Sequence, residues 1–238
     1  MKTVAELNTK IFADGADKTG ILELYAKPWV RGFTTNPTLM RAAGVSDYKV
    51  FATEILEAIP DRPFSLEVFA DDFDEMERQA LMIADWGTNV YVKIPVMNTK
   101  RQPSYELVRR LARRGLQLNV TAIMTLAQVR DVVLCLEGSP SSYVSVFAGR
   151  IADTGRDPMP LMAAAVELLL PNSSLELIWA SAREVLNIFQ ADSVGCHVIT
   201  VTHDILKKLP LIGKDLDEFS WETARMFYDD GQRAGFVL

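Results

Sequence analysis

A lysine inside an apolar segment is the residue of this sequence best suited to covalent chemistry. Lys93 interrupts the run Asn-Val-Tyr-Val-Lys-Ile-Pro, which is typical of a parallel strand buried on both faces. Desolvation makes an amine less basic, and the neutral amine is the form that attacks a ketone to give a Schiff base. A structural lysine paired with a carboxylate produces the same pattern. Asp14 and Glu67 end two other strand-like segments, and each suits either an ion pair or general-base catalysis of carbon–carbon cleavage, so both interpretations stay open.

Two arginines follow strand-like segments further along the chain. Arg150 and Arg183 carry guanidinium groups that could hold a phosphate with paired hydrogen bonds, which predicts a phosphorylated substrate. Surface salt bridges with Asp153 and Glu184 are the alternative explanation, and the sequence does not decide between the two.

Further polar side chains stand at other strand ends. Asn119 and Thr121 are spaced by two, so they point the same way along one strand and could hold a water or a substrate hydroxyl. A buried hydrogen-bonded pair would look identical in the sequence. The remaining candidates at strand ends are Thr35, Asn36, Ser145, Phe147 and Ser181.

The elements that must position these residues are short apolar or β-branched segments alternating with longer amphipathic ones. Eight such segments are predicted as strands. They are 11–14, 32–34, 64–68, 90–94, 116–120, 143–147, 175–179 and 197–201. Helices are predicted between them, for example over 47–58, 72–86 and 126–136, and Gly87, Gly115, Gly138 and Gly195 stand where helix C-termini favour glycine.

Eight strand–helix units without a Gly/Ser-rich or Pro-rich linker indicate one α/β domain over 1–238. At this length the pattern predicts a (β/α)₈ TIM barrel, with an open doubly wound sheet as the alternative. In a barrel, the strand ends that carry the candidate residues meet at one face. Residues 216–233 predict an additional amphipathic C-terminal helix that covers a barrel end or reaches a neighbouring subunit, and we expect a homo-oligomer.

Composition excludes several functions. The net charge of -6 argues against a nucleic-acid partner, and 49% hydrophobic residues suffice for a large core.

Cys135 and Cys196 have neither the spacing of a disulfide framework nor that of a zinc site, so we expect a cytoplasmic protein. No apolar run approaches the ~20 residues that cross a bilayer, so no membrane association is expected. His197 and His203 lack metal-site spacing and receive no role, and we expect chemistry by side chains alone, without cofactor or metal.

Taken together, these segments resemble the transaldolase family, in particular its short-chain branch, over nearly the whole chain. The similarity is most specific in Thr-Thr-Asn-Pro at 34–37, in Lys-Ile-Pro at 93–95 and in Gly-Arg-Ile at 149–151. It extends through 12–14, 32–38, 92–95, 118–121, 143–151 and 180–183.

The resemblance implies an aldehyde/ketone transferase of class I aldolase type. Such an enzyme moves a dihydroxyacetone unit from fructose 6-phosphate or sedoheptulose 7-phosphate to an aldose phosphate, as in the pentose phosphate pathway, without a cofactor. The implied catalytic residues are Lys93 as the Schiff-base lysine, Asp14 as the acid/base, and Glu67 with Thr121 around the catalytic water. The implied sugar-binding residues are Asn36, Thr35, Asn119, Ser145 and Phe147, and the implied phosphate-binding residues are Arg150, Ser181 and Arg183.

The resemblance also covers fructose 6-phosphate aldolases, which release free dihydroxyacetone. In those enzymes Gln and Tyr are expected at the positions of Glu67 and Phe147, so this chain has the transaldolase pair. A tyrosine hydroxyl there would help to bring in the releasing water, whereas Phe147 keeps the spot dry. A catalytically silent phosphosugar-binding barrel is a third hypothesis, although it predicts loss of the lysine or its base.

The chain departs from the family pattern at three places near the barrel mouth. Gly15-Ala16 stands where relatives usually carry Thr or Ser, Val146 stands where proline is usual, and Thr202-His203 replaces a proline-containing segment. None of these departures removes a matched catalytic residue.

Overall fold

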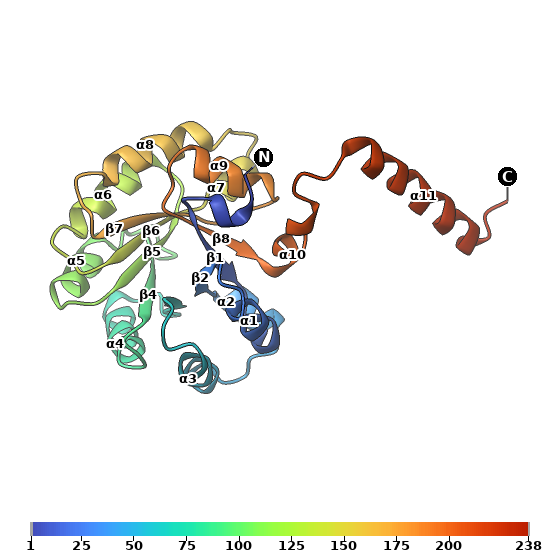
Figure 1. The fold of residues 1–238 in the computed structure, drawn as a ribbon. Helices are drawn as coiled ribbons and strands as arrows, with labels where there is room; N and C mark the ends of the chain where they lie inside the picture. The colour runs from blue at the N-terminus through green and yellow to red at the C-terminus, as the bar shows by residue number, and fades with distance from the viewer. Residues whose placement is uncertain (1, 238) are drawn as a thin grey trace.

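The computed structural model describes residues 2–237, which form a closed barrel of eight parallel strands (Figure 1). The strands pair in chain order, and β8 closes the barrel against β1. The predicted (β/α)₈ fold is therefore confirmed, and the open-sheet alternative is wrong. The strands are β1 (Lys10–Asp14), β2 (Val30–Thr34), β3 (Phe64–Glu67), β4 (Val90–Pro95), β5 (Leu118–Ile123), β6 (Ser142–Val146), β7 (Leu175–Trp179) and β8 (Val198–Thr202).

Helices surround the barrel and cover the outer faces of its strands (Figure 1). Side chains cap several of them, because an aspartate or threonine oxygen accepts a backbone N–H of the first turn, as Asp17 and Asp72 do. The α-helices are α1 (Lys18–Tyr25), α2 (Pro37–Ala42), α3 (Tyr48–Ala58), α4 (Phe73–Ala84), α5 (Tyr105–Arg113), α6 (Leu126–Cys135), α7 (Ala148–Ala152), α8 (Met159–Leu169), α9 (Leu186–Ser193), α10 (His203–Leu206) and α11 (Leu216–Ala234). Two 3₁₀ turns, η1 (Val4–Glu6) and η2 (Leu209–Leu211), complete the described chain.

The predicted strand boundaries lie within two residues of the observed ones except at the end of β5, and one predicted helix-end glycine, Gly87, differs from the others. β5 begins two residues later than expected and runs on to Ile123, because a left-handed residue, Ala122 with φ 62°, forms an irregularity in the strand before its last residue. Thr121 therefore lies inside the strand and not just after it. Gly115, Gly138 and Gly195 have the positive φ expected at helix ends, whereas Gly87 is absent from that set.

Three aromatic side chains fill the half of the barrel interior that lies nearer the N-terminal ends of the strands. Phe12 packs edge-to-face on Tyr143 with 5.6 Å between ring centroids, and Tyr91 lies 4.3 Å from Tyr143. Gly32 makes room for this aromatic floor, since a Cβ there would stand 2.6 Å from Cζ of Phe12. The floor leaves the opposite, C-terminal half of the interior for polar residues.

Strand alternation sets what lies above the floor. Successive side chains of a strand point to opposite faces, so the residue two positions after each floor aromatic also faces the interior. These residues are Asp14, Lys93 and Ser145, which follow the floor aromatics of β1, β4 and β6.

The C-terminal helix α11 extends away from the barrel, as the red segment of Figure 1 shows. None of its residues is buried, and Leu216, Phe227 and Tyr228 are 66% to 78% exposed. Large apolar side chains that gather on an exposed surface are typical of interaction sites. No helix within residues 2–237 is long and apolar enough to cross a lipid bilayer.

Candidate active site

A cavity of about 500 Å³ opens at the C-terminal ends of the strands. This is the end of a (β/α)₈ barrel where enzymes place their catalytic groups. The structure brings eleven of the twelve predicted site residues onto the wall of this cavity. They are Asp14, Asn36, Glu67, Lys93, Asn119, Thr121, Ser145, Phe147, Arg150, Ser181 and Arg183.

The Lys93 amine lies between a carboxylate and a backbone carbonyl. Its Nζ stands 3.0 Å from Oε2 of Glu67 and donates a 2.8 Å hydrogen bond to the carbonyl oxygen of Thr35. The lysine side chain is only 8% exposed, so the surroundings exclude most solvent from the amine. The ion-pair interpretation of the sequence is therefore realised with Glu67, while the amine still faces the cavity, where a ketone could reach it.

Asp14 faces the same cavity from β1. Its Oδ1 accepts a 2.7 Å hydrogen bond from the hydroxyl of Thr34, whose oxygen also lies 2.5 Å from Oγ1 of Thr200. Burial raises the pKa of the Asp14 carboxyl, the nearby charge of Lys93 and the Thr34 hydrogen bond oppose this, and the charge of Glu67 adds to it. A carboxyl with a raised pKa holds a proton more readily, which suits it to act as an acid as well as a base.

Asn119 is the centre of a buried hydrogen-bond chain. Its Nδ2 donates to Oγ of Ser65 at 3.0 Å, and its Oδ1 accepts from Oγ of Ser145 at 2.6 Å. These two bonds fix the orientation of the Asn119 amide, with Nδ2 toward Ser65 and Oδ1 toward Ser145. Thr121, two residues further along β5, lines the cavity as its spacing predicts.

The two residues after β2 have different positions. Asn36 lines the cavity and caps α2, since its Oδ1 accepts from the backbone N–H of Leu39 at 3.0 Å. Thr35 is fully buried and lies outside the cavity lining; its hydroxyl has no hydrogen-bond partner within residues 2–237. Thr35 therefore reaches the site through its backbone carbonyl, which holds Lys93.

The two arginines lie at one rim of the cavity. Arg183 forms a two-point ion pair with Asp153, with Nε to Oδ1 at 3.0 Å and Nη2 to Oδ2 at 2.5 Å, so the salt-bridge alternative holds for this residue. Arg150 stands with its guanidinium carbon 5.9 Å from the centroid of the Phe147 ring. Both arginines are exposed and contribute to the cavity wall.

A tight backbone contact joins the segments that carry these arginines. A Cβ on Gly149 would stand 1.6 Å from the carbonyl oxygen of Ser181, so only glycine fits. Ser181 itself has φ 64°, a left-handed conformation that is strained for serine. Backbone strain of this kind is typical of functional sites.

Several cavity residues were not predicted from the sequence. Thr34, Thr200 and Thr202 line the same cavity as Asp14, although they were not among the predicted site residues. Strand periodicity holds the signal for the two β8 threonines, because they alternate with apolar residues in Val-Ile-Thr-Val-Thr. Within the described chain, no group of three or more His, Cys, Asp or Glu side chains is arranged to hold a metal ion.

Replacing Asp14 by asparagine should stabilise the fold in a pH-dependent way. Because the folded-state pKa is raised, the wild type loses stability as pH rises from the ordinary aspartate pKa, about 4, toward the folded-state value. Asp14→Asn should therefore match the wild-type melting temperature near pH 4 and exceed it near pH 7. Thermal denaturation across this range measures the difference.

Asp153→Asn is the matched control for this measurement. The hydrogen bond from Arg183 lowers the pKa of Asp153, so its contribution to stability is present above the ordinary aspartate pKa and is lost as pH falls. The control variant should show no gain at neutral pH. A melting difference for Asp14→Asn that is independent of pH would contradict the burial argument.

Known proteins give an independent view of this chain. The family described as transaldolase/fructose-6-phosphate aldolase matches residues 11–236. A protein of Herpetosiphon aurantiacus named "Probable transaldolase" is 33% identical over 214 residues, covering 88% of this chain and 92% of its own, and one of Methanococcus maripaludis with the same name is 34% identical over 220 residues, covering 90% and 98%.

Solved structures resemble the barrel at much lower identity. Dihydrodipicolinate synthase from Rhodopseudomonas palustris superimposes with a TM-score of 0.56 at 16% identity, over 97% of this chain and 81% of its own, which supports the fold alone. The family match and the relatives above 30% identity are decisive: this chain belongs to the transaldolase/fructose-6-phosphate aldolase family.

Proposed function

We propose that this protein is a transaldolase that transfers a dihydroxyacetone unit from fructose 6-phosphate or sedoheptulose 7-phosphate to an aldose phosphate. The single observation that carries the proposal is the Lys93 amine, buried above the aromatic floor, 3.0 Å from Glu67 and open to a cavity that also contains Asp14. Schiff-base chemistry needs a shielded amine beside a proton acceptor, and that arrangement meets both needs.

The reaction begins at Lys93. Glu67 accepts a proton from Nζ, the amine lone pair attacks C2 of the ketose, and loss of water leaves an iminium bond. Asp14 then takes the proton of the C4 hydroxyl, the C3–C4 bond breaks, and the aldose phosphate leaves. The electron pair of that bond remains on the lysine adduct as an enamine. Attack of the enamine on a new aldehyde reverses these steps, and hydrolysis of the final iminium returns the free amine.

The other residues divide between the sugar and its phosphate. Asn36, Asn119 and Ser145 offer amide and hydroxyl groups to the ketose hydroxyls, and Thr121 with Glu67 holds the water of the hydrolytic steps. Arg150, Ser181 and Arg183 bind the phosphate at the rim. Arg183 must share or leave Asp153 to do so, since that carboxylate already occupies its guanidinium.

The apolar part of the cavity wall favours transfer over release of dihydroxyacetone. Phe147 contributes an apolar ring that is half-buried there. An apolar wall excludes the water that would protonate the enamine, so the adduct persists until an aldehyde arrives. The aldolase activity of the same family remains the second candidate.

We also infer one catalytic domain over 1–238, a cytoplasmic location and a role in pentose phosphate metabolism. Two buried, unbonded cysteines are consistent with a reducing compartment. The exposed apolar face of α11 supports a homo-oligomer in which this helix contacts another copy. Ending the chain after Leu211 should then lower the mass measured by light scattering, whereas the full chain should exceed one subunit.

Lys93→Met should abolish sugar-phosphate transfer while the fold remains intact, because the amine is lost but the apolar stem is kept. Borohydride treatment with fructose 6-phosphate should label the wild type covalently at Lys93 and leave the variant unlabelled. Lys93→Arg is the matched control, since it retains a cation beside Glu67 and should lose labelling as well. Transfer activity in either variant above background would exclude the Schiff base.

The arginines should act on the phosphate and not on the chemistry. Arg150→Ala and Arg183→Ala should each weaken kcat/KM for fructose 6-phosphate by about 10- to 100-fold, the value of one charge-assisted hydrogen bond of ~1.5–3 kcal/mol. Cleavage of unphosphorylated fructose should change little. Arg156→Ala serves as the control, because this exposed arginine is outside the cavity lining. Equal losses on both sugars would assign the arginines to the fold.

Phe147→Tyr should shift the balance from transfer toward release. The added hydroxyl can deliver a proton or a water to the enamine carbon, so free dihydroxyacetone should rise by roughly tenfold when no acceptor is present. A coupled dihydroxyacetone assay with and without erythrose 4-phosphate measures both reactions. Rapid release by the wild type without acceptor would favour the aldolase instead.

A further inference from the structure

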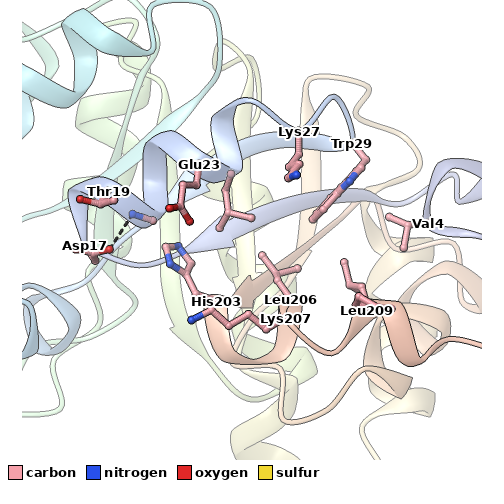
Figure 2. Close-up of a pocket in the computed structure, with 13 residues that line it drawn as sticks. Val4, Asp17, Thr19, Glu23, Lys27, Trp29, His203, Leu206, Lys207 and Leu209 are labelled. Carbon is pink, nitrogen blue, oxygen red and sulfur yellow. Dashed lines mark hydrogen bonds between the residues drawn. The ribbon is translucent and has the colours of Figure 1, made fainter.

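A second cavity of about 600 Å³ lies on the flank of the barrel between α1 and the α10–η2 segment (Figure 2). The imidazole of His203 points from the start of α10 toward the first turn of α1 and is half-buried there. Its Nε2 is buried and has no hydrogen-bond partner within residues 2–237. A polar ring kept in such a place at the cost of a hydrogen bond calls for an explanation.

Two glycines form the slot that holds this ring. A Cβ on Gly15 would stand 2.7 Å from Nε2 of His203, and a Cβ on Gly20 would stand 2.7 Å from Nδ1. Neither glycine belongs to the positive-φ set, so their backbone conformations would accept alanine. The absence of a side chain at both positions therefore serves the close approach of the imidazole.

The slot begins at the residue that follows Asp14, the proposed acid/base. In the β1–β8 ladder Asp14 is paired with Thr202, so Gly15 and His203 are the residues that follow this pair on the two strands. On its other side, the backbone N–H of Gly15 donates to the carbonyl of Thr34 at 3.0 Å. The first peptide after Asp14 is thus held between β2 and the imidazole.

Burial outweighs the charged groups near the ring. Burial lowers the pKa of His203; Asp17 and Glu23 of the α1 region and Asp204 of α10 act in the opposite direction, and Lys207 of α10 lowers the pKa as well. The ring is therefore neutral at neutral pH, and it contacts the glycines as a rigid flat body and not as an ion-pair partner.

We propose that His203 is a positioning residue: its imidazole, wedged between Gly15 and Gly20, fixes the backbone after Asp14 and so aims the carboxylate at the C4 hydroxyl of the substrate. This inference rests on the proposed function, because it takes Asp14 as the acid/base. Gly15 and His203 thereby act as one steric pair.

Four variants of the full chain test the proposal. Gly15→Ala crowds the ring and His203→Ala leaves the slot empty, and each should lower kcat for transfer by about 10- to 100-fold, the effect of a misplaced catalytic group. KM for fructose 6-phosphate and borohydride labelling of Lys93 should stay within about threefold of wild type, since neither the phosphate site nor the amine is touched. The double variant Gly15→Ala/His203→Ala places a methyl in the vacated slot and should recover kcat to within about threefold. Gly231→Ala is the control, because nothing stands within 4 Å of its Cβ position.

Gly20→Ala provides a second route if a Gly15 variant does not fold. Helix propensity alone predicts that alanine in α1 raises the melting temperature, whereas the slot predicts that it lowers it. A Cβ on Gly20 would also stand 2.9 Å from Oδ2 of Asp17, so the slot is tested by the part of the loss that His203→Ala restores. A loss that is the same with and without His203→Ala would contradict the slot.

The possible outcomes distinguish failure of the His203 proposal from failure of the transaldolase proposal. Unchanged kcat in His203→Ala, measured well below its melting temperature, or a double variant no better than the single ones, would reduce His203 to a packing residue. A wild type that gives no borohydride adduct would overturn the transaldolase proposal instead. Labelling that persists while kcat falls is the expected signature of a misplaced Asp14.

Discussion

Alternation of side chains along the strands of a closed barrel is the constraint on which the site depends. Every second residue of each strand must face the interior, and eight strands provide too little room for large residues at every level. Phe12 and Tyr91 both pack on Tyr143 and occupy one level of β1, β4 and β6. The next level on the same strands is left with Asp14, Lys93 and Ser145, so a dry aromatic layer and a polar cavity are two consequences of one periodicity.

Charge at the polar level is balanced within the barrel. A buried ammonium is costly unless a partner and hydrogen bonds compensate for lost water, and Lys93 obtains both from Glu67 and the carbonyl of Thr35. The same two groups orient Nζ toward the cavity. Asp14 lines the same cavity, but it accepts a hydrogen bond from the hydroxyl of Thr34 and does not pair with the lysine directly. The two carboxyls of the site therefore have different surroundings, and different surroundings allow two carboxyls to take different roles.

The sequence was sufficient for the residues whose position follows from local pattern. Lys93 and Asp14 could be located because apolar strands with single polar interruptions mark their inward faces, and all eight strands were found within a few residues. The link from Thr34 to Thr200 could not be found, because it joins β2 and β8, which come to lie on either side of β1 only when the barrel closes. The slot around His203 was missed for the same reason, and both histidines received no role.

Other misses have local causes. The end of β5 was placed too early because a left-handed alanine, Ala122, leaves no mark in composition. Arg183 forms a salt bridge, as one of its two interpretations held, and it also borders the cavity, so its phosphate-binding role stays a prediction. The direction of α11 away from the barrel could not be predicted, because amphipathicity alone does not specify which surface a helix packs against.

Closure of the barrel also has a kinetic meaning. The pairing of β1 with β8 joins nearly the two ends of the barrel-forming chain, whereas every other pairing joins neighbours in sequence. Contacts between distant segments lose the most chain entropy on forming and tend to form late. Asp14 stands at this seam opposite Thr202, while the partners of Lys93, which are the carbonyl of Thr35 and the strands β3 and β5, all precede β6 in the chain. During synthesis, the residues around Lys93 are therefore all present before β8 emerges. The surroundings of Asp14 are complete only after β8 has paired with β1.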